Sequence, residues 1–283
     1  MQKRNDENSF EGVPYLIAID MEDHLRTRLV RAMHVHDDRV EILLVRKGTG
    51  THTVDSCTYT TGPGDILIYN AGVAHDECAD PQHGMDIFSC SIGGIKFKDL
   101  PAHTILPPDV RPVIQDGAYS AEVEALMSML YTANLSQKGS DGEMMKYLLY
   151  TLLLLVRKAA EQHIDPAKKE EQYWAKQIQE YSDAHYLEEI TVAGIADALN
   201  LSRYYLSHVF KQALGYSPMQ YVIRRRIGEA QSWLLMSEKS VTDIAYLVGY
   251  NSASNFNNAF RDMIGVSPQK YREHWLGKKG NNH

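Results

Sequence analysis

The sequence has few cysteines and no long apolar run, and these two absences exclude several classes of protein. Its three cysteines, Cys57, Cys78 and Cys90, show no paired spacing, which argues against a disulfide-stabilised secreted scaffold. The longest apolar stretch, LLYTLLLLV at 148–156, is well short of the roughly 20 residues that a membrane-spanning helix needs. The opening residues MQKRNDENSF contain no apolar segment typical of a signal peptide. We therefore expect a cytoplasmic protein without a membrane partner.

The net charge of −7 also argues against a nucleic-acid-binding protein until the charge is followed along the chain. Residues 200–283 hold 11 Lys and Arg against 5 Asp and Glu, a balance of +6. Residues 1–199 hold the other 18 basic and 31 acidic residues, a balance of −13. A basic end on an acidic body is typical of a chain in which one domain binds a polyanion.

The pattern of apolar residues divides the chain into three parts. Residues 10–117 contain short β-branched stretches separated by Gly and Pro, which predicts an all-β sandwich or barrel. Residues 118–165 contain two segments with apolar residues at helical spacing, 119–135 and 143–162. After a polar stretch, the pattern of residues 172–275 is helical throughout. The predicted fold class is α+β multidomain, with a β-barrel, a helical segment and an all-α C-terminal domain.

The C-terminal part contains an internal repeat. The pattern Gly-x-Ser-Pro-x-x-Tyr begins at Gly215 and again at Gly265. A glycine at the end of a helix, then Ser as N-cap and Pro at the first helical position, stops one helix and starts the next. Similar apolar patterns precede the two copies, over about 191–214 and 240–264. Each pattern predicts a short helix, a tight turn and a longer helix, and therefore a helix-turn-helix unit.

The turn and cap residues of the two units support this interpretation. Asn200 and Gly249 occupy the same turn position, and both residue types tolerate positive φ. We expect Ser202 to cap the second helix of the first unit and Asn251 to cap that of the second unit. In a helix-turn-helix unit the second helix enters the DNA major groove. The alternative is a plain helical bundle with two hairpins.

The outward-facing residues of the two second helices are suited to double-stranded DNA, and none of them is acidic. Amide, hydroxyl, imidazole and guanidinium groups are the groups that contact base edges and phosphates. A helix of about 18 residues between the units, roughly 27 Å long, would place them in successive segments of the major groove. The candidate DNA-binding residues are Arg203, Tyr204, Ser207, His208 and Lys211 in the first unit, Arg224 and Arg226 in the spacer, and Ser254, Asn257, Asn258 and Arg261 in the second unit.

The stretches LSRYYLSHVFKQALGYSPMQYVIRRRIGEAQSWL and VTDIAYLVGYNSASNFNNAFRDMIGVSPQKYR closely resemble the AraC/XylS family of bacterial transcription regulators. The resemblance covers about a third of the chain, and it is specific because two linked patterns must coincide at the right separation. It implies a tandem helix-turn-helix domain that activates or represses promoters, with RNA polymerase as a further partner. Many members of the family carry Arg where this sequence has Asn258, so its base preference is expected to differ there.

The N-terminal part contains two stretches that resemble the cupin motifs. They are HVHDDRVEILLVRKG, which begins at His34, and GDILIYNAGVAH, which ends at His75. AraC-type regulators often carry a cupin-like barrel as their sensor domain, so the resemblance implies that this domain binds a small-molecule effector. The second motif departs from the cupin pattern, because Asn70 replaces the usual Pro.

The polar residues of these motifs, His34, His36, Glu41 and His75, are the candidate effector ligands. A His-x-His pair on a strand places both imidazoles on one face, and Glu41 and His75 complete a set of nitrogen and oxygen donors. Glu41 lies five residues after His36 and needs a β-bulge to face inward. Three interpretations remain open: an organic effector such as a sugar or another small metabolite, a divalent transition metal, and structural histidines.

The leading hypothesis is a sequence-specific DNA-binding regulator that senses a small molecule in its barrel and forms a homodimer through the helices of 119–162. The alternative is a metal-dependent cupin enzyme that carries a DNA-binding domain. The sequence contains no nucleophile motif, phosphate loop or cofactor fingerprint. We therefore expect a regulator that has no catalytic residues and requires no cofactor.

Overall fold

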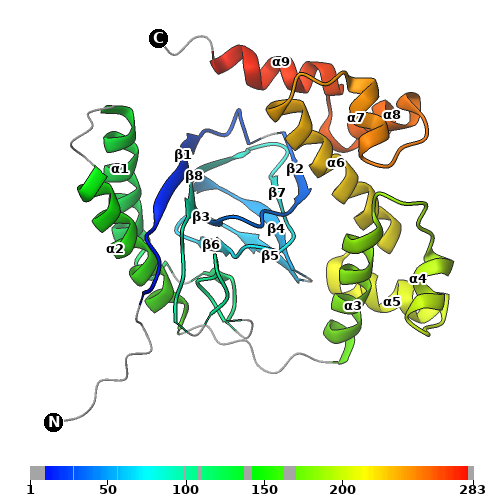
Figure 1. Ribbon diagram of the computed structural model, residues 1–283, viewed down its shortest axis with the longest axis horizontal. Helices are drawn as coiled ribbons and strands as arrows, with labels where there is room; N and C mark the ends of the chain where they lie inside the picture. Colours follow the sequence, from blue (N-terminus) through cyan, green and yellow to red (C-terminus); the bar gives the residue numbers. More distant parts are fainter. Residues whose placement is uncertain are drawn as a thin grey trace.

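The chain folds into an N-terminal sheet domain, a pair of helices and a C-terminal helical domain, which confirms the predicted fold class. Figure 1 shows the sheet domain between the two helical parts. Within the described part of the chain, every helix is too short or too polar to cross a membrane. This computed structural model describes residues 10–27, 29–55, 57–98, 100–107, 110–115, 117–136, 142–161 and 170–279. The predicted domain boundary after residue 165 lies outside these residues.

The N-terminal domain consists of two antiparallel sheets. The five-stranded sheet has the order β1-β8-β3-β6-β9, and the four-stranded sheet has the order β2-β7-β4-β5. Side chains alternate along β3, so Leu43 and Val45 point between the sheets while Ile42 and Leu44 point outward. The strands are β1 (Tyr15–Glu22), β2 (Arg31–His34), β3 (Val40–Gly48), β4 (Gly50–Val54), β5 (Cys57–Thr61), β6 (Ile66–Tyr69), β7 (His75–Ala79), β8 (Met85–Gly93) and β9 (Val113–Ile114).

Helices α1 (Ser120–Ser136) and α2 (Gly142–Ala160) begin and end within two residues of their predicted bounds. They cover the outer face of the five-stranded sheet, on the left of Figure 1. Their inward side chains, among them Val123, Met127 and Leu152, are fully buried in one core with that sheet. Much of the apolar surface that suggested a dimer interface is therefore used within the chain.

The C-terminal domain contains the two predicted helix-turn-helix units, α4–α5 and α7–α8, joined by α6. The turns have the expected backbone, because Asn200 and Gly249 both adopt positive φ, 54° and 83°. Gly215 and Gly265 end α5 and α8 in the left-handed conformation, as predicted. The helices are α3 (Glu170–His185), α4 (Val192–Ala198), α5 (Arg203–Leu214), α6 (Pro218–Met236), α7 (Val241–Leu247), α8 (Ala253–Ile264) and α9 (Pro268–Lys279).

The sequence predicted N-caps for only some of these helices, and one of those predictions is wrong. Ser202 caps α5, and Ser217 begins α6 with a capping box and Pro at the start of the helix. The predicted cap of α8 is wrong, because Ser252 rather than Asn251 accepts the first-turn N–H. The second unit has one extra residue in its turn, which moves the capping position from Asn251 to Ser252.

Helix α6 also packs along β2, an edge strand of the four-stranded sheet. Gly228 lies so close to the backbone of Met33 that a Cβ atom would be 1.9 Å from the Met33 carbonyl oxygen. The side-chain amide of Gln231 forms two hydrogen bonds with the backbone at the start of β2. Its Oε1 accepts from the Ala32 N–H and its Nε2 donates to the Val30 carbonyl, both at 2.8 Å. One helix therefore joins both helix-turn-helix units and the N-terminal domain.

Candidate effector site and DNA interface

The structure brings the four candidate effector residues together between the two sheets. His34 and His75 form a cross-strand pair of β2 and β7, and Glu41 faces them from β3 of the opposite sheet. His36 completes the group, and one possible ligand atom from each residue lies within 4.8 Å of the other three. The sequence therefore identified a real cluster, which we call the His/Glu cluster.

Two details of the backbone differ from the prediction. Strand β2 ends at His34, so His36 lies beyond the strand rather than beside His34 on it. Glu41 faces inward because residues 35–39 connect strands of different sheets, and the alternation starts afresh in β3. The irregularity in the pairing of β3 with β8 lies between Val45 and Lys47. The expected bulge before Glu41 is therefore wrong, and the loop takes its place.

Backbone carbonyls orient two of the imidazole rings. The Nδ1 atoms of His34 and His75 lie 2.9 Å from the carbonyl oxygens of Ala32 and Val73. A carbonyl only accepts, so each Nδ1 carries the proton and each Nε2 presents a lone pair. The Nε2 atoms of His34, His36 and His75 are buried and have no hydrogen-bond partner among the described residues. Three buried ring nitrogens without a partner thus meet between the sheets, and those of His34 and His75 each present a lone pair.

Glu41 adds a carboxylate to this group. The Ser91 hydroxyl donates to Glu41 Oε1 at 2.9 Å and holds the carboxylate in place from the neighbouring strand β8. The two carboxylate oxygens lie 3.3 Å from His36 Nε2 and 3.5 Å from His75 Nε2. Neither Nε2 atom has a hydrogen-bond partner among the described residues, so the four groups converge without forming short hydrogen bonds to one another.

The electrostatics keep His34 and His36 neutral and the carboxylate of Glu41 ionised. Burial, reinforced by the charge of Arg31, holds the pKa of His34 well below its usual value, and burial lowers that of His36 to about 4. Burial alone would raise the pKa of Glu41, but the charge of Arg31 together with His75 and His36 outweighs burial and holds that pKa well below the usual range. Neutral imidazole and ionised carboxylate are the forms that bind metal ions, and this donor set fits a divalent transition metal.

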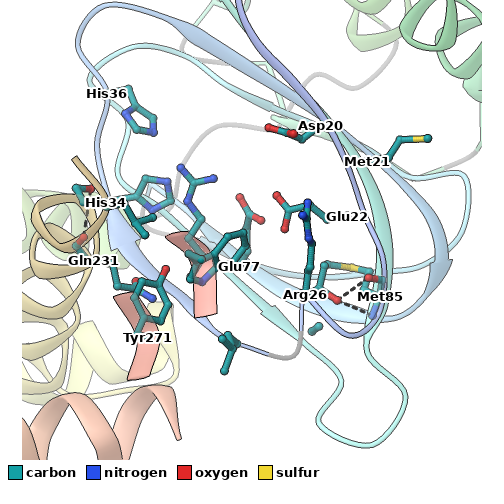
Figure 2. Close-up of a pocket in the computed structure, with 18 of the residues that line it drawn as sticks. Asp20, Met21, Glu22, Arg26, His34, His36, Glu77, Met85, Gln231 and Tyr271 are labelled. Carbon is teal, nitrogen blue, oxygen red and sulfur yellow. Dashed lines mark hydrogen bonds between the residues drawn. The ribbon is translucent and has the colours of Figure 1, made fainter. Parts of the chain in front are cut away.

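A cavity of about 460 Å³ lies between the N-terminal domain, at β1 and β2, and helices α6 and α9. Its volume lies in the usual range for small-molecule sites. Figure 2 shows His34 and His36 on the cavity wall with Asp20 and Glu22, and Gln231 and Tyr271 on the side of the C-terminal domain. The further residues that line the cavity include Arg26, Arg31, Glu77, Met85, Tyr131, Gly228, Ser232, Leu235, Met236 and Trp275. Both domains therefore form the walls.

Sequence reasoning missed the charged residues of this cavity. Arg31 and Glu77 are a cross-strand pair of β2 and β7, and burial raises the pKa of Glu77 to about 8. Burial therefore favours the protonated form of the Glu77 carboxyl, which can donate a hydrogen bond. A charged residue that faces inward from an alternating strand indicates a polar site in the core. The sequence did not fix where these strands end, so it did not show which charged residues face inward.

The candidate DNA-binding residues of the first unit lie on an open face of α5. Arg203, Tyr204, His208 and Lys211 are exposed, and Ser207 is half-buried. The Tyr204 side chain is 81% exposed, and its ring stacks on that of His208.

The second unit presents a matching face on α8. Ser254, Asn258 and Arg261 are exposed, and Asn257 is half-buried. The amide nitrogen of Asn257 donates to the Ala253 carbonyl at 2.8 Å, whereas Asn258 accepts from the Arg261 guanidinium at 3.1 Å. Asn258 is therefore better placed than Asn257 to offer its amide to a base.

The spacer arginines have partners within the chain. Arg224 pairs with Asp76 of the N-terminal domain at 3.1 Å, and Arg226 donates to the carbonyls of Tyr186 and Glu188 between α3 and α4. The structure does not bring these two arginines together with the exposed faces of α5 and α8. Their assignment as DNA contacts stays a prediction that requires their release.

Comparisons with known proteins agree with this division of the chain. Residues 22–153 match the AraC-like ligand binding domain, and residues 195–274 match a helix-turn-helix domain. YdiP of Escherichia coli strain K12, an uncharacterized HTH-type transcriptional regulator, is 29% identical over 84% of this chain and 80% of its own. The transcriptional activator RhaS of Citrobacter koseri is 27% identical over 84% of this chain and 86% of its own. The C-terminal domain of AraT, a response regulator from Geobacillus stearothermophilus, is 33% identical over 36% of this chain and 84% of that domain, with a TM-score of 0.35.

The matched regions correspond to the parts of the structure that carry the two candidate sites. The helix-turn-helix match includes α5 and α8, and the ligand-binding match includes the His/Glu cluster. The relatives are named as transcriptional regulators, and the chain matches a helix-turn-helix domain and a ligand-binding domain, so it is a DNA-binding transcriptional regulator with a domain for a small-molecule effector rather than an enzyme. The chain belongs to the AraC/XylS family of transcriptional regulators.

Proposed function

We propose that this regulator binds its effector in the cavity between the two domains, and that the bound effector controls how α5 and α8 meet DNA. The observation that carries the proposal is that one cavity has walls from both domains. A ligand there contacts β1 and β2 on one side and α6 and α9 on the other. Such a ligand favours one arrangement of the domains over another, and differential contact is what shifts a conformational equilibrium.

The cavity suits a polar metabolite such as a sugar. It offers carboxylates at Asp20 and Glu22 and a guanidinium at Arg31, which together accept from and donate to hydroxyl groups. The rings of Tyr271 and Trp275 add apolar surface at the opposite wall. His34 and His36 reach the ligand directly, while Glu41 and His75 lie behind them in the cluster.

On DNA, the exposed faces of α5 and α8 both contact bases, and α5 also contacts phosphate. Arg203 and His208 are suited to guanine and Asn258 to adenine, because these side chains match the acceptor and donor patterns of the major groove. Lys211, on the last turn of α5, is suited to phosphate. Residues 200–228 contain no acidic side chain, so the first unit and the start of α6 add no repulsion.

The dimer of the hypothesis would use the outer face of α1 and α2. Met129 on α1 and Met144, Tyr147 and Leu154 on α2 expose 44% to 62% of their surface. The three α2 residues are spaced by three and seven positions and so share one side of the helix. A cytoplasmic homodimer that presents four recognition helices and contacts RNA polymerase is the assembly that we propose.

The DNA-binding part is tested with sites selected from random duplexes. The footprint should contain two contact patches per chain, about 10 base pairs apart.

Lys211→Ala should weaken binding to every sequence and reduce the slope of log affinity against log salt by about 1. Asn258→Ala should instead cost about 1–3 kcal/mol at one or two base positions. Lys98→Ala, an exposed lysine of the N-terminal domain, is the matched control and should change neither quantity. A footprint over a single groove segment would refute the tandem arrangement.

The effector part is tested by thermal unfolding of the full chain with a panel of sugars and small organic acids. A ligand at a hundredfold excess over its dissociation constant should stabilise the chain by about 2.7 kcal/mol. His36→Ala should abolish this shift and leave DNA binding intact. His83→Ala, whose imidazole is exposed outside the cluster, should keep the shift. A shift that survives in the His36 variant would place the ligand elsewhere.

A further inference from the structure

We propose that the effector is a small zwitterion, such as an α-amino acid, whose ammonium group binds to Glu22 and Glu77 and whose carboxylate binds to Arg31. This inference rests on the proposed effector site and narrows its ligand to one class of polar metabolite. It starts from the charged side chains on the N-terminal wall of the 460 Å³ cavity. Among the described residues, no salt bridge joins these three side chains to one another.

Two carboxyl groups face the cavity from opposite sheets. Glu22 ends β1 of the five-stranded sheet, and Glu77 lies on β7 of the four-stranded sheet. Figure 2 shows both carboxyl groups in the same part of the cavity. Glu77 is only 9% exposed, and its Oε1 is buried with no hydrogen-bond partner among the described residues. Unpaired buried acceptors are rare in folded proteins. An ammonium group, with three donors and a positive charge, satisfies both carboxyl groups.

A guanidinium group lies beside these carboxyl groups. Arg31 on β2 is the cross-strand partner of Glu77. Burial alone would lower the pKa of Arg31, but the negative charges around it, those of Glu77 and Glu22 among them, outweigh burial and raise that pKa. Its guanidinium nevertheless forms no hydrogen bond with either residue in the described part of the chain. A guanidinium binds a carboxylate through two parallel hydrogen bonds, so the carboxylate of a ligand is a suitable partner.

The wall formed by the C-terminal domain is less polar. Tyr271 and Trp275 of α9 and Leu235 of α6 line the cavity there. The indole N–H of Trp275 is buried and has no partner among the described residues, so it offers one further donor. Charged groups on one wall and aromatic and aliphatic groups on the other suit a ligand with a zwitterionic head and a less polar side chain. An α-amino acid has this form.

Ligands with a single charge, or with none, suit these groups less well. An amine without a carboxylate would be repelled by Arg31 and would leave that guanidinium unpaired. An organic acid without an ammonium group would be repelled by Glu22 and would leave both carboxyl groups unpaired. A sugar can bond to all three side chains, but it brings no charge to compensate theirs. In a partly buried cavity, where charges are weakly screened, such differences decide between ligands.

The first test compares ligands on the unmodified full chain. Isothermal titration calorimetry with the standard L-amino acids should identify at least one that binds. The α-amide of that amino acid keeps the ammonium group but loses the carboxylate, whereas its N-acetyl derivative keeps the carboxylate but loses the ammonium group. Each derivative should bind at least about tenfold more weakly, because each loses a charge-assisted contact. This series needs no variant and therefore does not depend on how a variant folds.

The second test assigns the two charges of the ligand to side chains. Glu22→Gln should weaken binding of the amino acid by about tenfold or more but leave the affinity of its N-acetyl derivative unchanged. Arg31→Gln should weaken binding of the amino acid but leave the affinity of its α-amide unchanged. Arg31→Lys, which keeps the charge and loses the paired hydrogen bonds, replaces Arg31→Gln if that variant does not fold. Glu122→Gln, an exposed glutamate of α1, is the control and should bind as the parent does.

Three results would overturn the proposal. The ligand is not a zwitterion if no amino acid binds at millimolar concentration, or if both derivatives bind as tightly as the amino acid. Equal affinity in the parent, the Glu22 variant and the Arg31 variant would assign the amino acid to another part of the chain. A sugar that binds in place of amino acids, and that His36→Ala displaces, would refute the zwitterion while the proposed effector site stands. The proposed function itself fails only if the chain does not bind DNA or if no ligand depends on the cavity.

Discussion

The contact between Gly228 and β2 allows a test of whether the two domains pack together in solution. Gly228 lies in the middle of α6, where alanine is a better helix former by about 1 kcal/mol. In the C-terminal domain alone, Gly228→Ala should therefore stabilise the fold. In the full chain, the added Cβ would lie 1.9 Å from the Met33 carbonyl oxygen and 2.9 Å from that of Ala32. The same substitution should then act against the domain contact.

The size of this effect follows from the distances. Ordinary contact needs about 3.5 Å, so helix and strand must separate by about 1.6 Å. Both bonds between Gln231 and β2, at 2.8 Å, would then lengthen beyond hydrogen-bonding range, at about 1 kcal/mol each. The pair of Arg224 with the buried Asp76 would also weaken. A loss of about 2–4 kcal/mol in total exceeds the helical gain, so the sign of the effect should reverse between the two forms.

The assay is calorimetry on the full chain and on residues 170–283, each with and without Gly228→Ala. We expect a higher melting temperature for the variant domain and a lower one for the variant full chain. Ser232→Ala, one turn further along α6 and half-buried, is the control and should shift both forms in the same direction. If Gly228→Ala also shifts both forms in the same direction, the packing of α6 on β2 is not part of the solution structure.

Three further results are expected. Asp76→Asn should lower the urea midpoint because it removes the charge that pairs with Arg224, and an unchanged midpoint would mean that the pair is not formed. Burial lowers the pKa of His52 from 6.5 to about 4, so the unfolded chain takes up its proton first and stability falls as the pH drops through this window. From about pH 7 to 5, His52→Gln should lose about 2 kcal/mol less stability than the parent, whereas parallel curves would contradict the shift. Tyr147→Glu with Leu154→Glu should turn the proposed dimer into soluble monomers on sedimentation, and a monomeric parent would exclude the dimer.

The repeat was predictable because its signals are local. A left-handed glycine after a helix and a Ser-Pro pair before the next one depend on residues within a few positions. Gly215, Gly265 and Ser217 accordingly have their predicted roles. The single error, Asn251 for Ser252, arose because both residue types cap helices well. The extra residue in the turn decides which of the two begins α8, and the capping preferences of Asn and Ser do not show its position.

The His/Glu cluster shows where such reasoning stops. The identity of the four residues followed from the cupin resemblance, but the route by which Glu41 reaches them did not. The predicted bulge before Glu41 assumes that His36 and Glu41 lie on one strand and that side chains alternate through residues 35–39. These residues instead connect two sheets, and the alternation has no meaning across such a loop.

The contacts between domains were unpredictable because their partners are far apart in sequence. Gln231 and Ala32 are separated by 199 positions, and nothing near either residue distinguishes this glutamine from a solvated one. The same applies to Arg224, whose partner Asp76 lies 148 positions earlier. A run of three arginines in a basic region favours DNA contact on composition alone. In the free protein, Arg224 instead pairs with the buried carboxylate of Asp76.

Helix α6 is the element through which effector and DNA can influence each other. Successive side chains of a helix point about 100° apart, and three consecutive arginines therefore reach three different partners. Arg224 pairs with Asp76 of the N-terminal domain, Arg225 with Asp183 of α3 at 2.6 Å, and Arg226 with the carbonyls that follow α3. Arg225 also donates to the Met33 carbonyl of β2 at 3.5 Å. If the effector binds in the proposed cavity, we expect a movement of β2 against α6 to reach both helix-turn-helix units through this helix and so to change how α5 and α8 meet DNA.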